Sequence, residues 1–273
     1  MNNTYIQRRG FSLIEISIVL VVIALIIGGI AAGRSLIRNS EMQSVIKEST
    51  AYTQAIGSFR QKYLALPGDF SGATALWGAA DADFDDCKIT ASSNGVVTCD
   101  GDGNGRIMNQ GAGNSDTYYE QFRAWQHLSN AGFIDGNYSG IASSGTLGYR
   151  IGVTIPESKF GRAGWRVLTV TTRDITELPT PNVTEMGYQL GDIPPGVVLW
   201  WGGNNIDNSL RMTPIISSGE AFTLDTKIDD GMGGTGKLVG QINSTGTCYN
   251  SSTMAYKPVS DNVSCALIFK TGH

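Results

Sequence analysis

The chain has 273 residues, of which 41% are hydrophobic, and its formal net charge at pH 7 is −4. This length suits one large or two modest domains, and the hydrophobic share is sufficient for a packed core. The net charge is negative rather than strongly positive, which argues against nucleic acid as a partner. The 35 glycines favour loops and β-structure over a helical bundle.

The N-terminus combines a short cationic segment with a long apolar one. Residues 1–10, MNNTYIQRRG, carry Arg8 and Arg9, and residues 16–33 contain no charged side chain. As a helix, this apolar run spans about 27 Å, close to the thickness of the hydrocarbon core of a bilayer. The arginines should stay in the cytoplasm, so we expect a single-pass protein of the bacterial inner membrane whose remaining chain is exported.

Glu15 stands at the start of the apolar run, where an ionised side chain is unexpected. An ionised carboxylate in hydrocarbon costs about 2–3 kcal/mol even on lenient insertion scales. A carboxylate at low dielectric requires a cationic partner or an escape to the interface by snorkelling. The position of this charge therefore needs a specific explanation.

The order of residues around this glutamate provides one. A basic leader, then GFSLIE at residues 10–15, then a long apolar helix strongly resembles the leader of type IV prepilins and type II secretion pseudopilins. The resemblance implies cleavage after Gly10 by a prepilin peptidase and N-methylation of the new terminus, Phe11. It also implies that Glu15 pairs with the amino terminus of a neighbouring subunit during filament assembly.

The helix is expected to continue beyond the membrane segment, to about Tyr63. Apolar side chains recur at steps of three, four and seven on one helical face. Pro67 and Gly68 should end the helix. We therefore expect a membrane and filament-core helix over 11–33 and an amphipathic half over 34–63. The apolar positions are Met42, Val45, Ile46, Tyr52, Ile56, Phe59 and Tyr63.

Residues 64–273 should form the exported head. We predict an irregular insertion over 81–115, then a helix that begins at Asn114 or Ser115 and ends at Gly132. Alternating or continuously apolar runs predict strands at 149–155, 165–172, 196–202, 237–243 and 265–270. The expected fold class is α+β and pilin-like, with the long helix packed on an antiparallel sheet.

Four cysteines fall into two close pairs. Cys87 and Cys99 are 12 positions apart, and Cys248 and Cys265 are 17 apart. An even count in an exported chain predicts two local disulfides, although four buried thiols would fit a reduced protein. Neither pair has the spacing of a zinc site.

The segment DGDGNGRI, residues 100–107, has oxygen-bearing side chains at alternate positions. Asp100, Asp102 and Asn104 match the first half of an EF-hand loop, whose ligands converge as the backbone coils around Ca²⁺. The backbone carbonyl of Arg106 can add a further oxygen. The sequence therefore predicts a calcium site, although a solvated turn would have the same composition.

The second half of an EF-hand loop is missing, because Gly111 stands where a bidentate glutamate is expected. Asp116 or Glu120, on the helix predicted to follow, could close the coordination shell instead. The surrounding segment also resembles members of the same family in which such a loop precedes a helix similar to EQFRAWQHLSNAG.

A second acidic loop lies near the C-terminus and includes Asp225, Asp229 and Asp230. Its DDG sequence is similar to acidic loops of pilin-like proteins, some of which bind Ca²⁺, but a charged β-turn is an equally good interpretation. The overlapping GMGGTGK, residues 231–237, has the spacing of a phosphate-binding loop. Leu238 replaces the required Ser or Thr, so we expect no nucleotide.

The sequence offers no catalytic constellation. His127 and His273 are the only histidines, and His127 has the setting of a packing or surface residue. Trp200 and Trp201 are better explained as core or subunit contacts than as a sugar platform. We therefore expect a structural protein rather than an enzyme.

The function implied is that of a structural subunit of a type IV pilus or pilus-like filament. Its partners would be other pilin-like subunits, the prepilin peptidase and methyltransferase, and an inner-membrane assembly platform. The alternatives are a pseudopilin of type II secretion and a minor pilin with an adhesive or DNA-uptake head. The mature protein would then reside in a pilus at the cell surface or in a periplasmic pseudopilus.

Overall fold

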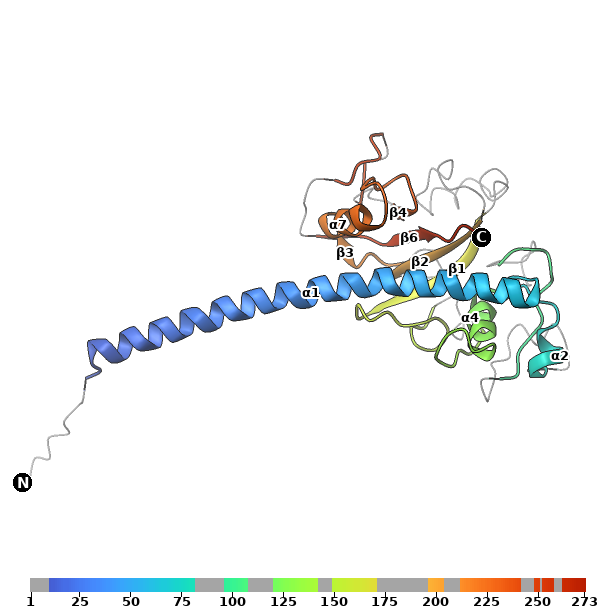
Figure 1. The fold of residues 1–273 in the computed structure, drawn as a ribbon, viewed down its shortest axis with the longest axis horizontal. Helices are drawn as coiled ribbons and strands as arrows, with labels where there is room; N and C mark the ends of the chain where they lie inside the picture. Colours follow the sequence, from blue (N-terminus) through green and yellow to red (C-terminus); the bar gives the residue numbers. More distant parts are fainter. Residues whose placement is uncertain are drawn as a thin grey trace, which may run out of the picture. The chain divides into compact units, whose positions relative to one another are not determined.

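The computed structural model describes residues 10–81, 96–107, 120–141, 149–170, 196–203, 212–241, 248–250, 252–257 and 262–273. Internal contacts divide the chain into two compact units, Met1–Gln43 and Ser44–His273. Figure 1 shows the helices and strands of both units, coloured along the sequence. Each unit is described by itself.

The helix α1 extends without interruption from Leu13 to Tyr63 and contains 51 residues. This confirms the predicted long helix, with its start two residues later than expected. Its most apolar 18-residue window has a mean hydropathy of 2.9, and none of that window is buried. Leu25, for example, is 71% exposed. By length and composition, α1 can cross a membrane.

The part of α1 that belongs to the second unit packs on the head through the predicted face. Val45, Ile56 and Phe59 are completely buried. The ring of Tyr52 lies 5.6 Å from that of Trp165, which belongs to strand β1 (Ala163–Val170). This half of α1 is therefore held against the sheet by aromatic and aliphatic contacts, which are the largest source of stability in such a core.

The main sheet has four antiparallel strands in the order β1-β2-β6-β4. Strand β2 (Gly196–Gly203) pairs with β1 on one side and with β6 (Leu267–Lys270) on the other, and β4 (Leu238–Gly240) forms an edge. Side chains of β2 are buried from Val197 onward. The predicted α+β, pilin-like architecture of a long helix on an antiparallel sheet is confirmed.

Two further helices contact this frame. Helix α4 (Glu120–Asn130) is the described part of the helix predicted to begin near residue 115, and residues 108–119 lie outside the described part of the chain. A short helix, α2 (Ala73–Trp77), follows the turn that ends α1. Trp200 and Trp201 are buried in the core, as the sequence indicated.

A second, two-stranded sheet pairs β3 (Ile216–Ser217) with β5 (Val263–Cys265). The helix α7 (Ser218–Ile228) begins directly after β3 and was not predicted. It starts with a capping box, because Ser217 and Glu220 each satisfy the other's backbone N–H. That serine-to-glutamate spacing was the available signal.

Two strand predictions were wrong in detail. Residues 149–155 form a turn, in which the carbonyl of Arg150 accepts hydrogen bonds from the N–H groups of Val153 and Thr154. Gly152 has φ of +79°, which a strand would not allow. The predicted strand 265–270 is instead divided between β5 and β6, which belong to different sheets.

The disulfide Cys248–Cys265 is present, as predicted, with a sequence separation of 17. Cys99 is also disulfide-bonded. Its predicted partner, Cys87, lies outside the described residues. The cross-link ties Cys265, in β5, to Cys248 in the segment that follows β4.

Glu48 joins α1 to the head through three hydrogen bonds. Its carboxylate accepts from the hydroxyl of Ser158 at 2.6 Å, the backbone N–H of Lys159 at 2.8 Å and the indole N–H of Trp165 at 2.8 Å. Charged acceptors make stronger hydrogen bonds than neutral ones. Glu48 is therefore a polar anchor beside the apolar face of the helix.

We expect Glu48→Ala to lower the free energy of unfolding by about 2–4 kcal/mol, because three donors lose one charged acceptor. Urea unfolding of the full chain in detergent, followed by tryptophan fluorescence, measures the change. Glu41→Ala is the matched control, since Glu41 only pairs with Arg38 across one helical turn in a partly exposed ion pair. Equal midpoints for the two variants would contradict the prediction.

Candidate functional site

The start of α1 presents the residues of the predicted processing and assembly site. Gly10 and Phe11 precede the helix in non-helical backbone, and Phe11 is 86% exposed. The peptide bond between them is therefore accessible without unwinding any helical turn. This arrangement suits proteolysis, which requires an extended and accessible backbone.

Glu15 takes part in a contact that the sequence reading missed. Its Oε2 accepts a hydrogen bond from the backbone N–H of Ser12 at 2.7 Å, and the Ser12 Oγ accepts from the N–H of Ile14 at 3.3 Å. These reciprocal contacts satisfy two N–H groups that the first helical turn leaves without partners. The Ser-x-x-Glu spacing within GFSLIE was the available signal.

In the head, the predicted calcium loop lies against the turn that follows α1. The N–H of Gly101 donates to the carbonyl of Phe70 at 3.0 Å, and the N–H of Gly103 donates to the carbonyl of Asp69 at 3.1 Å. A Cβ at Gly101 would lie 2.3 Å from the Gly68 carbonyl oxygen. Glycine is therefore required for this close approach of the two backbones.

Three carboxylates meet where the loop, this turn and α4 come together. Asp69, Asp102 and Glu120 each offer one oxygen, and these oxygens lie within 4.8 Å of one another. Asp102 and Glu120 were predicted ligands, whereas Asp69 was not singled out from the sequence. The group could hold a metal ion, and oxygen-only ligands suit a hard cation.

The other predicted ligands have different surroundings. Asp100 accepts hydrogen bonds from the backbone N–H and the hydroxyl of Thr74, at 2.8 and 2.9 Å, and does not belong to the carboxylate group. Asn104 donates its backbone N–H and side-chain amide to Asp102. Arg106 lies near the end of the same loop, and Asp116 is outside the described residues.

Asp69 is the most unusual member of the group. Its side chain is 2% exposed, Oδ2 accepts from the N–H of Gly105 at 3.0 Å, and Oδ1 has no hydrogen-bond partner. Burial raises the pKa of Asp69 to about 6; the Gly105 N–H opposes this shift and the neighbouring Asp102 adds to it. A buried carboxylate oxygen without a partner is rare and requires an explanation.

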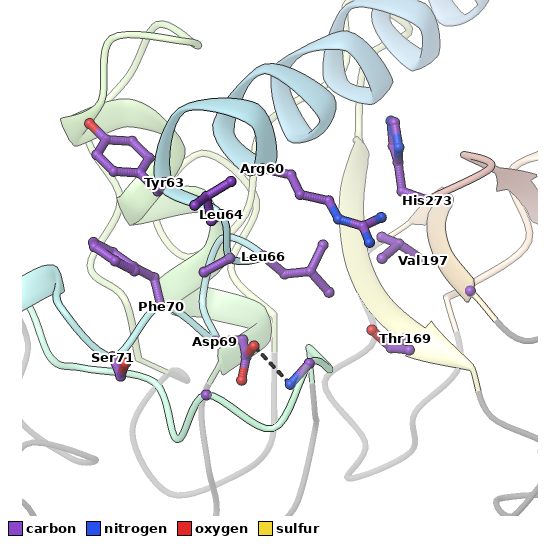
Figure 2. A pocket seen from close by; sticks show the side chains of 14 residues that line it. Arg60, Tyr63, Leu64, Leu66, Asp69, Phe70, Ser71, Thr169, Val197 and His273 are labelled. Carbon is purple, nitrogen blue, oxygen red and sulfur yellow. Dashed lines mark hydrogen bonds between the residues drawn. The ribbon is translucent and has the colours of Figure 1, made fainter.

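Asp69 also borders a pocket of about 600 Å³. Figure 2 shows the pocket between the end of α1 and β1, with Arg60 and His273 on its walls and a dashed line for the hydrogen bond to Asp69. Asp69 forms no ion pair with Arg60.

The second acidic group, Asp225, Asp229 and Asp230, is also compact enough to hold an ion. Each of its three carboxylates, however, already accepts a hydrogen bond from a nearby group. Asp225 accepts from Tyr256 and from the Gly231 N–H, and these bonds oppose the burial that raises its pKa to about 6. Backbone N–H groups and Thr235 occupy the other two carboxylates.

The glycine-rich segment 231–237 lies between α7 and β4. It thus joins a helix to a strand, whereas a phosphate-binding loop joins a strand to the N-terminus of a helix. The N–H of Lys237 donates to Asp229 rather than pointing into an open cradle. This order of elements lacks the helix N-terminus on which phosphate binding depends.

His127 is completely buried in α4. Its Nδ1 accepts from the N–H of Gly68 at 3.0 Å, so we assign the proton to Nε2, which faces the carbonyl of Cys99 at 3.1 Å. Burial lowers the pKa of His127 to about 3. The imidazole is therefore a neutral bridge between the turn after α1 and Cys99, the residue that precedes the 100–107 loop.

Comparison with known proteins agrees with the N-terminal reading. The family described as the prokaryotic N-terminal methylation motif matches residues 7–31. This motif marks prepilins and pilin-like proteins, a structural rather than an enzymatic class. No curated protein and no solved structure is significantly similar to the chain.

The buried imidazole predicts a pH dependence of stability. Below pH 6.5 the unfolded imidazole binds a proton, whereas the folded one does so only near pH 3, so the free energy of unfolding falls as pH falls. The slope from this group is about 1.4 kcal/mol per pH unit. His127→Gln keeps one acceptor and one donor but does not titrate, so its stability should fall less.

Thermal unfolding of both full-length proteins in detergent between pH 7 and 4 measures the difference. Taking the difference removes contributions from other groups, including Asp69, whose raised pKa acts in the opposite direction. The same pH dependence in both proteins would contradict a neutral His127.

Proposed function

We propose that this chain is a structural subunit of a type IV pilus or pilus-like filament. Residues 1–10 form a leader that prepilin peptidase removes after Gly10, and the new N-terminal Phe11 is methylated. Residues 11–33 serve first as membrane anchor and then as filament core, residues 34–63 continue the helix, and residues 64–273 form the exported head. The observation that carries this proposal is the methylation motif at the start of an uncovered apolar helix.

The apolar surface of α1 supports two successive environments. Large hydrophobic side chains remain exposed from Leu13 to Ile37, an area far beyond the isolated apolar residues of an ordinary protein surface. Lipid can cover this surface in the membrane, and the helices of neighbouring subunits can cover it in a filament. Both environments exclude water, so exchanging one for the other requires no refolding of α1.

Glu15 favours the move of α1 from the membrane into the filament. In the membrane, the Ser12 N–H donates to its carboxylate and lessens the penalty of an incompletely solvated charge. After cleavage, a neighbouring subunit presents the charged amino group of its own Phe11. An ion pair at low dielectric is much stronger than the same pair in water. We infer that this pairing selects the filament over the lipid-embedded monomer.

We further propose that the head binds Ca²⁺ at the 100–107 loop. The convergence of Asp102 with Glu120 supports this, because two predicted ligands far apart in sequence come together. The DGDGNG spacing supplies the coiled backbone that calcium loops use.

We expect Gly10→Ala to abolish processing, because a side chain at the scissile residue obstructs its recognition by the peptidase. Immunoblotting of membranes should show the full precursor in the variant and a form shorter by ten residues in the wild type. Mass spectrometry of the mature protein should find a methylated Phe11. Normal maturation of the variant would refute the cleavage site.

We expect Glu15→Ala to insert in the membrane at least as well as the wild type, since a charge is removed from the apolar segment. Assembly should fall at least tenfold, because the neighbour's amino group loses its partner. Quantifying sheared filaments against membrane-embedded protein separates these steps, with Ser17→Ala as an exposed control on the same turn. Filament yield equal to that of the control would rule out the pairing.

The same strains decide between the pilus and the secretion pseudopilus. Loss of surface filaments and twitching with normal exoprotein release indicates a pilus subunit. Loss of exoprotein release alone indicates a pseudopilin. Normal behaviour in all three assays would overturn the assembly role.

A further inference from the structure

Three chain segments meet at Asp69: the turn after α1, the 100–107 loop and the first residue of α4. The loop donates two N–H groups to this residue, from Gly103 to its carbonyl and from Gly105 to its Oδ2. The N–H of Asp102 faces Oε1 of Glu120 at 3.3 Å. Asp69 is thus held by the backbone of the 100–107 loop through both its carbonyl and its side chain.

The carboxylate of Asp69 carries negative charge that no basic side chain compensates in the described part of the chain. Asp69 is 2% exposed and its Oδ1 has no partner, although two further carboxylates lie within 4.8 Å. Asp69 and Glu120 are buried, whereas Asp102 is exposed, and the two buried carboxylates repel each other strongly at this separation unless a cation compensates them. Among the described residues, no basic side chain forms an ion pair with Asp69 that could provide this compensation. A metal ion would satisfy the orphaned oxygen and the charge together.

The ligand set identifies the class of metal. The group contains carboxylate oxygens alone, with neither the nitrogen nor the sulfur that zinc sites use. Oxygens on opposite sides of Ca²⁺ lie about 4.6–5.2 Å apart, and a coiled glycine-rich loop can add backbone carbonyls and waters. Mg²⁺ prefers a tighter octahedral shell and keeps most of its water.

We propose that Asp69 is the buried ligand of a calcium site shared with Asp102 and Glu120. This inference rests on the calcium binding proposed above, and it assigns the central ligand to a residue outside the EF-hand-like segment. The cation would clamp the turn after α1 to the loop and to α4. Calcium would therefore stabilise the head at the end of the long helix.

The contrast with the C-terminal acidic group supports this choice of site. There, Tyr256, Thr235 and backbone N–H groups donate to the three carboxylates, so each carboxylate already has a donor from the protein. At Asp69 one buried oxygen has no such donor. Of the two acidic groups in the described part of the chain, the Asp69 group is the one that leaves a buried carboxylate oxygen for a cation to satisfy.

The test is Asp69→Asn in the full-length protein, purified in detergent and freed of metal with EDTA. Asparagine keeps the shape and an oxygen that can accept from Gly105, but it removes the charge. We expect calorimetric Ca²⁺ affinity to fall at least tenfold. Without calcium the variant should melt at the wild-type temperature or above, because repulsion is relieved, whereas calcium should raise only the wild-type melting temperature.

Three further variants distinguish the possible results. Asp102→Asn should also weaken binding, whereas Asp229→Asn and the exposed Asp135→Asn should not. If the wild type binds no Ca²⁺ at millimolar concentration, the calcium proposal itself fails. If the wild type and Asp69→Asn bind Ca²⁺ equally well, the calcium proposal stands but the assignment of Asp69 is overturned. The assignment of Asp69 is also overturned if Asp229→Asn is the one variant that abolishes binding. Magnesium at the same concentration should not reproduce the shift in melting temperature.

Discussion

The apolar surface of α1 between Leu13 and Ile37 has no cover within the described part of this chain, and that constraint governs the rest. A helix of this composition cannot remain exposed to water, so its environment must come from lipid or from other subunits. The described part of the head buries its own segment of α1, around Val45, Ile56 and Phe59, in a core.

The polar groups of the head reflect how that fixation is achieved. Glu48 and His127 lie among apolar residues, yet each has its donors and acceptors satisfied by groups from distant parts of the sequence. These hydrogen bonds require particular orientations of their groups, whereas the hydrophobic effect alone does not fix how the segments pack. Asp69 departs from this pattern, because one of its buried oxygens has no protein partner. Other buried polar atoms also have no hydrogen-bond partner among the described residues, including the indole N–H of Trp125 and the Ser218 hydroxyl, but Asp69 Oδ1 is the carboxylate oxygen in this set, and a bound cation would satisfy it.

Glu15 illustrates how one residue can serve two states. The sequence places its charged side chain at the start of an apolar membrane segment. The structure adds that its carboxylate accepts a hydrogen bond from the backbone N–H of Ser12, at the start of the same helix. The local contact and the proposed contact with a neighbour use the same atoms. A partner that carries full positive charge is the stronger of the two at low dielectric.

Local patterns decided much of what could be predicted. The helix to Tyr63, the strands around Trp165 and Trp200 and the disulfide of Cys248 all follow from periodicity or spacing along the chain. The strand expected at 149–155 failed because Gly152 and the carbonyl of Arg150 favour a turn, which alternation does not reveal. Helix α7 was missed although its capping box was legible in the sequence.

The sequence by itself determined the apolar helix and the class of protein and predicted the leader, because those features depend on composition and on neighbours in the chain. Only the tertiary structure decided which carboxylates come together. Asp100 belongs to the calcium-loop pattern but is bonded to Thr74, while Asp69, 33 positions before Asp102, lies beside it. The physical reason is that a cation site depends on distances through space. The close approach of glycine backbones brings these carboxylates together, and residue spacing along the chain does not predict that approach.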